Sequence, residues 1–292
     1  MKTRIISGIV MGAIVAAVLV VGFVCSSYVI TIAIALLAVG AIYELLRNAS
    51  GIKSKLAYIG ACIYSFLMVL ALDTEVYEAW FQRMPFARVG SKYISLSSCR
   101  IITQGELAIA LSAIYFIYAV FMVLKNHKDF DLAKIVSLCA LPLPYAYAFS
   151  CLNGIISNTG GIYYLLLLLN FSSICDMGAY FVGVTIGKHK LCPEISPKKT
   201  VEGAIGGIVS SIIFTVVISL LFKKFSIVIL LLTIPFCILG MIGDLFASAI
   251  KRSVGLKDYS NLIPGHGGIM DRLDSIIMIA PFMMISMLWG II

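Results

Sequence analysis

Two aspartates in the C-terminal part of the chain are placed where a metal ion and phosphate groups could meet. Asp244 lies inside an apolar run that begins at Ile227, and Asp271 stands at the start of the next apolar run. Burying a carboxylate in an apolar helix is costly, so such a residue is a candidate for function. If the two runs form a helical hairpin, both carboxylates approach one membrane surface. Mg2+ suits this arrangement, because it takes one or two carboxylates together with phosphate oxygens and water.

The residues around these aspartates are basic or rich in glycine. Lys251 follows Asp244 at a spacing that places both on one helical face. The connector ends in Pro264-Gly265-His266-Gly267-Gly268, whose backbone N–H groups can approach an anion closely. Asp274 shares a helical face with Asp271 and could either bind the ion or cap the last helix. We therefore predict a divalent ion that holds phosphates among the cations Lys251, Arg252, Lys257 and Arg272.

This hairpin resembles the signature of a known family, the phosphatidate cytidylyltransferases, also called CDP-diacylglycerol synthases. The resemblance rests on Ser248-Ala249-Ile250-Lys251-Arg252, on Lys257-Asp258, and on the run from Pro264 through Gly265-His266-Gly267-Gly268-Ile269-Met270 to Asp271-Arg272-Leu273-Asp274. It implies a nucleotidyltransferase that converts CTP and phosphatidate to CDP-diacylglycerol and pyrophosphate in phospholipid biosynthesis. It also implies a homodimer.

The resemblance, together with the residue types, gives each polar side chain an expected role. Asp244 and Asp271 are the expected Mg2+ ligands, with Asp176 and Asp274 as further candidates for these or for a second cation. Lys251, Arg252 and Arg272 are expected to hold phosphates during catalysis, and the alternative is that they pair with the aspartates or mark membrane topology. The substrate contacts expected in the connector are Lys257, His266, Gly267 and Gly268.

A third intramembrane carboxylate, Asp176, lies in an earlier apolar run. Asp176, Tyr180, Gly183 and Gly187 follow one another at helical spacing and therefore share one face. The glycines allow a neighbouring backbone to come close. Asp-Met-Gly-Ala-Tyr also resembles the family pattern, from which Met177 is a departure. We expect Asp176 and Tyr180 to line the substrate site, and the alternative is a structural carboxylate bonded to hydroxyl groups.

The polar stretch that follows contains a second motif similar to the family's. Its residues are Ser196-Pro197-Lys198-Lys199-Thr200-Val201-Glu202-Gly203. Two lysines can bind phosphate, and Thr200 can cap the helix that follows. Paired lysines in such a loop are also common topology signals. The expected substrate contacts here are Ser196, Lys198, Lys199 and Thr200.

Composition predicts the fold class. The chain has 292 residues, of which 61% are hydrophobic and 12% are charged, which is outside the range of ordinary soluble domains. An all-α, polytopic integral membrane protein is expected, because helices satisfy the backbone in lipid and about 20 apolar residues cross it. About nine transmembrane helices are predicted, over residues 5–24, 28–46, 57–72, 106–124, 133–151, 161–187, 204–222, 226–250 and 272–291.

Charge predicts the orientation of these helices. The net charge is +8, but the 22 lysines and arginines lie in short connections, mostly on one side of the predicted membrane. This is the positive-inside pattern and not a nucleic-acid-binding surface. We expect a bacterial inner (cell) membrane protein whose active site faces the cytoplasm, with CTP, phosphatidate and the lipid bilayer as partners and no nucleic acid.

The predicted organisation has two parts. Residues 1–160 would hold about five spans and an external loop near 73–104, and residues 161–292 would hold about four catalytic spans with cytoplasmic loops at 188–203 and 251–271. Two other functions also fit intramembrane aspartates beside basic residues. One is a cation-coupled transporter, and the other is a lipid or polyprenol kinase that uses CTP.

Overall fold

The computed structural model describes residues 2–24, 26–73, 88–89, 92–93 and 104–292. The chain forms two compact units, Met1–Gly154 and Ile155–Ile292. Most of the loop predicted at 73–104 lies outside the described residues.

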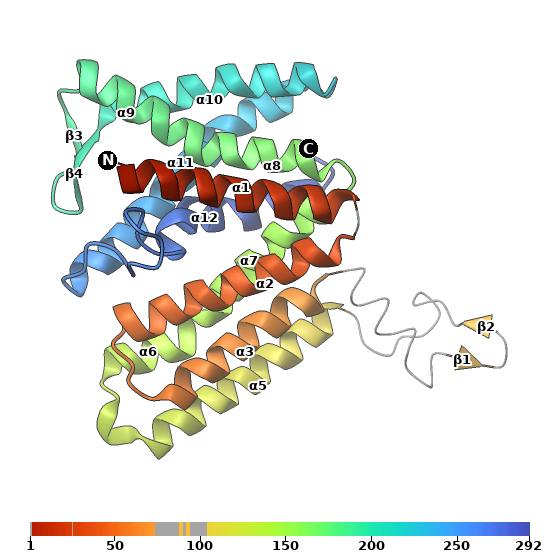
Figure 1. Cartoon of the computed structure of the whole chain (residues 1–292), viewed down its shortest axis with the longest axis vertical. Helices are drawn as coiled ribbons and strands as arrows, with labels where there is room; N and C mark the ends of the chain where they lie inside the picture. Colours follow the sequence, from red (N-terminus) through yellow and green to blue (C-terminus); the bar gives the residue numbers. More distant parts are fainter. Residues whose placement is uncertain (1, 25, 74–87, 90–91, 94–103) are drawn as a thin grey trace. The chain divides into compact units, whose positions relative to one another are not determined.

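The first unit is built from apolar helices. Its helices α2 and α3 lie side by side, and α3 also packs against α5 (Figure 1). A short antiparallel pair joins β1 to β2, with Val89 opposite Lys92. Its elements are α1 (Lys2–Val24), α2 (Tyr28–Tyr43), the π-helical turn η1 (Glu44–Ala49), α3 (Lys55–Ala71), β1 (Arg88–Val89), β2 (Lys92–Tyr93), α5 (Gln104–Lys125), the 3-10 turn η3 (His127–Asp129), α6 (Leu132–Ala140) and most of α7 (Pro142–Ser157).

A buried carboxylate ties three of these helices together. Asp73, just after α3, accepts hydrogen bonds of 2.7 Å from the Thr31 hydroxyl of α2 and from the Asn153 side chain of α7. Because a buried polar group without partners is costly, these donors fix how the three segments meet.

The second unit carries most of the predicted site. It contains α8 (Gly161–Leu169), the π-helical turn η4 (Asn170–Ile174), α9 (Cys175–Ile186), β3 (Lys190–Cys192), β4 (Ser196–Thr200), α10 (Val201–Leu221), α11 (Ile227–Ser253) and α12 (Met270–Leu288). Strands β3 and β4 pair antiparallel, with Lys190 opposite Thr200 and Cys192 opposite Ser196. The stretch 188–203, predicted as a loop, thus contains a β-hairpin.

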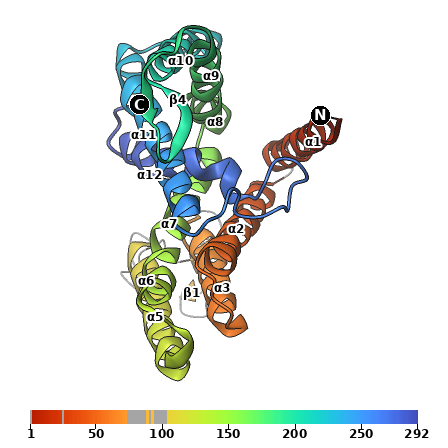
Figure 2. The ribbon, with the colours of Figure 1, turned by 90° about the vertical axis from the view of Figure 1, so that its left-hand side faces the viewer.

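Small residues bring α9 and α10 close together. The two helices lie side by side in Figures 1 and 2, with the β3–β4 hairpin between the end of α9 and the start of α10. A Cβ atom on Gly183 would lie 2.9 Å from the Thr200 hydroxyl and 3.6 Å from the Gly203 Cα. The predicted role of Gly183, which is to admit a neighbouring backbone, is therefore confirmed.

The helical content confirms the all-α fold class. Each predicted span is helical over most of its described residues. Six helical segments of the described chain are long and apolar enough to cross a membrane, so the count of nine stays a prediction. These six are Tyr28–Ala49, Gln104–Lys125, Leu132–Ser157, Gly161–Ile186, Val201–Leu221 and Ile227–Ser253.

Candidate active site

A cavity with charged residues in its lining opens in the second unit where α9, the β3–β4 hairpin, α10 and α11 meet. Its volume is about 510 Å3, within the range of small-molecule sites. Its lining includes all four residues of the stripe that begins at Asp176. The lining residues are Asp176, Ala179, Tyr180, Gly183, Val184, Gly187, Lys190, Leu191, Lys198, Lys199, Thr200, Ala204, Met241 and Asp244.

An ion pair between Lys199 and Asp244 crosses this cavity. Lys199 comes from β4 and Asp244 from α11, so the pair joins the hairpin to a membrane-length helix. The Asp244 side chain is 27% exposed and lines the cavity, whereas the ammonium group of Lys199 is itself buried and has Asp244 as its ion-pair partner. The structure therefore brings together a predicted phosphate-binding lysine and a predicted metal ligand.

Three carboxylates lie near one another in this region. Asp176, Asp244 and Asp274 are close enough for their charges to interact, and Lys199 and Lys251 offset part of that repulsion. Asp274 also accepts a 2.7 Å hydrogen bond from the Ser275 backbone N–H. A concentration of negative charge in an apolar unit favours the approach of a cation.

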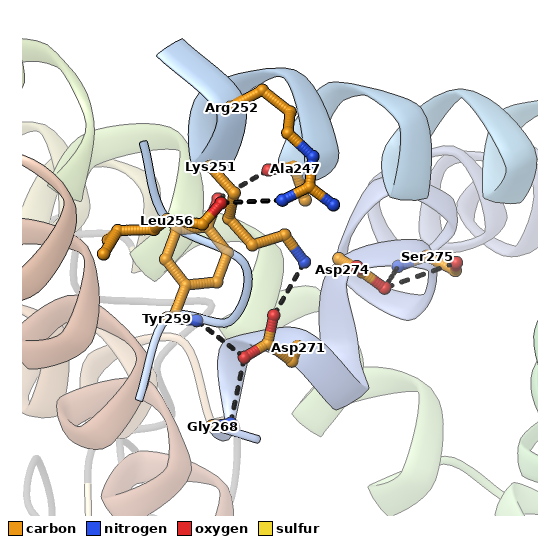
Figure 3. Close-up of polar contacts among 9 residues, drawn as sticks. All are labelled: Ala247, Lys251, Arg252, Leu256, Tyr259, Gly268, Asp271, Asp274 and Ser275. Atoms are coloured by element: carbon orange, nitrogen blue, oxygen red, sulfur yellow. Dashed lines mark hydrogen bonds and ion pairs between the residues drawn. The ribbon is translucent and has the colours of Figure 1, made fainter. Parts of the chain in front are cut away.

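Asp271 has different neighbours, which Figure 3 shows. One of its oxygens accepts a 2.7 Å bond from the Lys251 ammonium. The other accepts bonds from the backbone N–H groups of Tyr259, at 2.8 Å, and Gly268, at 2.9 Å. The Asp271 side chain is only 2% exposed. In this arrangement the carboxylate holds the connector between α11 and α12. Its bond to Lys251 matches the alternative in which the aspartates pair with the nearby cations.

The glycine-rich connector does approach an anion, and that anion is Asp271. Gly267 has a positive φ of 86° and forms a tight turn in which its N–H donates to the Ile263 carbonyl. A Cβ atom on Gly267 would lie 2.9 Å from the Asp271 carboxylate. Gly267 is therefore required both by its backbone conformation and by this close approach. Gly268 supplies the N–H that binds the same carboxylate.

The cations predicted around the connector separate into buried and exposed groups. Lys251 is buried between Asp271 and the ring of Tyr259, whose hydroxyl donates to the Ala247 carbonyl. Arg252 donates 2.8 Å to the Leu256 carbonyl, as basic residues do at the end of a helix. The other predicted contacts lie outside the cavity lining: Lys257 and Arg272 are exposed, and Ser196 and His266 are half-buried.

Thr200 caps α10, as predicted. Its hydroxyl accepts a 3.1 Å hydrogen bond from the Gly203 backbone N–H, and its backbone is extended. The cap fixes where β4 ends, and so it fixes the position of Lys199 directly before it.

Two features of the hairpin were missed in the sequence. Lys190 lines the cavity, because the β3–β4 register places it opposite Thr200. Glu202 fastens the base of the hairpin, since it accepts from the backbone N–H groups of Lys188 and His189 and pairs with the His189 ring at 2.6 Å. An acidic residue in the first turn of a helix was the available signal for Glu202.

The carboxylates of the cavity region offer ligands that suit Mg2+. Asp176, Asp244 and Asp274 offer the hard oxygen atoms that Mg2+ prefers, and Asp244 is accessible from the cavity. Within the described part of the chain, no three His, Cys, Asp or Glu side chains are grouped tightly enough to enclose an ion by themselves. The residues thus fit an ion whose remaining ligands are substrate phosphates and water, which is how Mg2+ is commonly held.

Comparisons with known proteins give the family of this chain. The sequence model of the cytidylyltransferase family matches residues 2–289. The phosphatidate cytidylyltransferase of Bacillus subtilis is 37% identical over 185 residues, which cover 61% of this chain and 67% of that protein. The phosphatidate cytidylyltransferases of Staphylococcus haemolyticus and Staphylococcus saprophyticus are 37% and 36% identical over 190 residues, covering 63% of this chain and 70% of each relative. The match extends over nearly the whole chain, and the chain therefore belongs to the cytidylyltransferase family.

Proposed function

We propose that this protein is a phosphatidate cytidylyltransferase, a membrane enzyme that converts CTP and phosphatidate to CDP-diacylglycerol and pyrophosphate. The observation that carries the proposal is the cavity in which Lys190, Lys198 and Lys199 face Asp176 and Asp244, in a chain of this family. The lysines suit the phosphates of both substrates, and the carboxylates suit the cation that accompanies CTP.

The reaction joins two phosphates without a protein nucleophile. A phosphate oxygen of phosphatidate attacks the α-phosphorus of CTP, and the bond from that phosphorus to the bridging β-phosphate oxygen breaks. Pyrophosphate leaves with the electron pair, and the α-phosphorus stays with the lipid product. A phosphate monoester is already ionised near neutral pH, so the attack needs no general base. The protein contributes chiefly by positioning and by offsetting charge.

The cavity residues divide this work. Lys198 and Lys190 hold the triphosphate of CTP through charge-assisted hydrogen bonds. Lys199 leaves Asp244 when substrate binds and stabilises the negative charge that develops on the departing pyrophosphate. Thr200 keeps Lys199 in place by fixing the start of α10.

The proposal includes Mg2+, held by Asp244 with Asp176 and Asp274 nearby. When bound, Mg2+ neutralises phosphate charge during the transfer. Asp244 supports this assignment because its carboxylate reaches the cavity. The prediction that Asp271 is a second ligand stays a prediction; its bonds to Lys251, Tyr259 and Gly268 support a role in shaping the connector.

The apolar helices and the bacterial relatives indicate a bacterial membrane protein. We place the active site on the cytoplasmic side for two reasons. CTP is cytosolic, and the connections around the site are rich in lysine, as cytoplasmic connections usually are. The proposed assembly is a homodimer, on the family resemblance, and light scattering of the purified protein in detergent tests it.

The experiment is an incubation of purified protein with Mg2+, phosphatidate and CTP labelled in either the α- or the γ-phosphate. Label from the α-position in the lipid supports the transferase. Label from the γ-position in the lipid would mean a lipid kinase. If neither label entered the lipid, the cation-coupled transporter would be the function that still fits. Asp244→Asn serves as the inactive variant, and Glu194→Gln, at an exposed residue outside the cavity lining, serves as the charge-matched control.

A further inference from the structure

A second basic cavity lies in the first unit, where the connection before α3 meets the connection between α5 and α6. Its volume is about 240 Å3. We call it the basic cavity, and its lining residues are Gly51, Ile52, Lys53, Ser54, Lys128, Asp129, Phe130 and Lys134. Ile52 and Phe130 are buried and anchor the two connections, so the lysines project from fixed backbone.

The three lysines of the basic cavity are not equivalent. Lys134 is engaged, since its ammonium donates 3.2 Å to the Asp129 carbonyl and lies 3.4 Å from the Asp131 carboxylate. Asp131 also caps α6 by accepting from the Lys134 backbone N–H. Lys53 and Lys128 are exposed, and their ammonium groups, by contrast, have no hydrogen-bond or ion-pair partner among the described residues. Two unpaired cations therefore face one cavity.

The start of α3 adds to the positive potential. Ser54 is the N-cap of this 17-residue helix and lines the basic cavity, and its side chain makes no capping hydrogen bond within the described structure. The first backbone N–H groups of a helix lack intrahelical partners and carry the positive end of its dipole. An anion between Lys53 and Lys128 would be stabilised by both features.

The position of the basic cavity relative to the membrane-length helices indicates the kind of anion that it binds. The segments Tyr28–Ala49 and Gln104–Lys125 end beside it, and Leu132–Ser157 begins beside it, and all three are long and apolar enough to cross a membrane. The cavity therefore lies at the depth of lipid headgroups. Its volume suits a phosphate with a small alcohol and is below the usual range for a nucleotide-sized ligand.

We infer that the basic cavity binds the phosphate group of an anionic ligand, at a place separate from the active-site cavity and independent of the proposed reaction. Lys53 and Lys128 donate to the phosphate oxygens. Asp129, which also lines the cavity, accepts from a hydroxyl of the same headgroup. A lipid with a phosphoglycerol headgroup carries both groups, and free glycerol phosphate is the soluble source of the same chemistry.

The test measures binding and not turnover, so it can fail while the proposed function stands. The full-length protein in neutral detergent is titrated with dioleoyl phosphatidylglycerol, and retained lipid is counted by native mass spectrometry. The variant Lys53→Gln/Lys128→Gln removes the two unpaired cations. Its matched control, Lys55→Gln/Lys125→Gln, removes two exposed lysines of the same helix ends that do not line the cavity. Size-exclusion chromatography verifies that both variants are folded.

We expect the cavity variant to bind phosphatidylglycerol at least about tenfold more weakly than the control variant, because two charge-assisted hydrogen bonds are lost. Competition by glycerol 3-phosphate at concentrations similar to those of the lipid would identify the soluble phosphate as the ligand. Absence of competition would identify the lipid, and both results support the site. Equal weakening in the two variants would overturn the inference, because bulk charge alone would then explain the binding. Absence of binding of both probes would also overturn it.

Discussion

The ammonium group of Lys199 forms an ion pair with the carboxylate of Asp244 across the active-site cavity. The two residues belong to different sequence motifs, one in the β3–β4 hairpin and the other deep in an apolar run that forms α11. Their contact makes the hairpin a wall of the cavity. It also gives Lys199 a resting position from which it can reach phosphate.

We predict that Lys199 and Asp244 act as one unit in turnover. Lys199→Gln should lower kcat by about 100-fold or more, since it removes a charge that stabilises the departing phosphate. The double variant with Asp244→Asn should lose little more than the more damaging single variant, because coupled residues are not additive. Steady-state kinetics with CTP and phosphatidate measure this. Lys188→Gln changes a residue outside the cavity lining, so it is the control and should keep native rates. If the losses of the two single variants add up in the double variant, the coupling is contradicted.

We also predict that Asp271 matters more for stability than Asp244 does. Asp271→Asn leaves the Lys251 ammonium, whose side chain is only 9% exposed, without its counter-charge. Breaking a buried pair in this way costs about 3–5 kcal/mol. Asp244→Asn also leaves the buried Lys199 ammonium without its counter-charge, but the cavity that both residues line can admit water, so the loss of Tm should be smaller than for Asp271→Asn. Thermal unfolding in detergent compares the two variants.

The opposite outcome would support Asp271 as a metal ligand. In that case Asp271→Asn would have the same Tm as the native protein and would need much more Mg2+ for turnover. A rescue experiment separates the cases further: Lys251→Met/Asp271→Leu replaces the pair by apolar groups and should recover most of the lost stability.

The sequence predicted the elements of this fold better than the partners of its charges. Apolar runs define membrane-length helices because a helix satisfies the backbone hydrogen bonds of a segment within that segment. The spacing from Asp176 to Gly187 correctly placed four residues on one helical face, and that face lines the cavity. The N-cap role of Thr200 also follows from local chemistry alone. These features depend on residues that are neighbours along the chain.

The pairing of cations with carboxylates depends on how connectors fold, and so it could not be read from the sequence. In the sequence, several lysines and arginines could pair with Asp271 or with Asp244. The turn at Gly267 decides that Lys251 pairs with Asp271, and the β3–β4 register decides that Lys199 pairs with Asp244. Lys190 was overlooked for the same reason. Its place in the cavity depends on a register that shifts between Lys190 and Cys192.

Gly267 should be far less tolerant of substitution than Gly255, although both have positive φ angles. The methyl group of Gly255→Ala would have no atom beyond its chain neighbours within 4 Å, so this variant should lose about 1–2 kcal/mol of stability from the backbone conformation alone. Gly267→Ala has the same backbone cost, and its methyl group would also press on the Asp271 carboxylate. The expected result is a clearly lower Tm for Gly267→Ala than for Gly255→Ala. Equal Tm values would show that the turn can relax away from Asp271.

The cap on α10 should control both stability and catalysis, because Thr200 is joined directly to Lys199. Thr200→Val keeps the shape of the side chain but leaves the Gly203 N–H without its acceptor, at a cost of about 1 kcal/mol. As the end of β4 loosens, Lys199 is held less firmly, so kcat should fall several-fold.

Thr200→Ser separates this effect from packing. It keeps the hydroxyl acceptor and removes only a methyl group, so it should retain nearly native kcat while losing a little stability. Thermal unfolding and steady-state kinetics on the two variants provide the comparison. If Thr200→Ser loses as much activity as Thr200→Val, then the methyl group and not the cap positions Lys199. The contact of Thr200 with the Gly183 and Gly187 face of α9 would then be the feature that sets the geometry of the cavity.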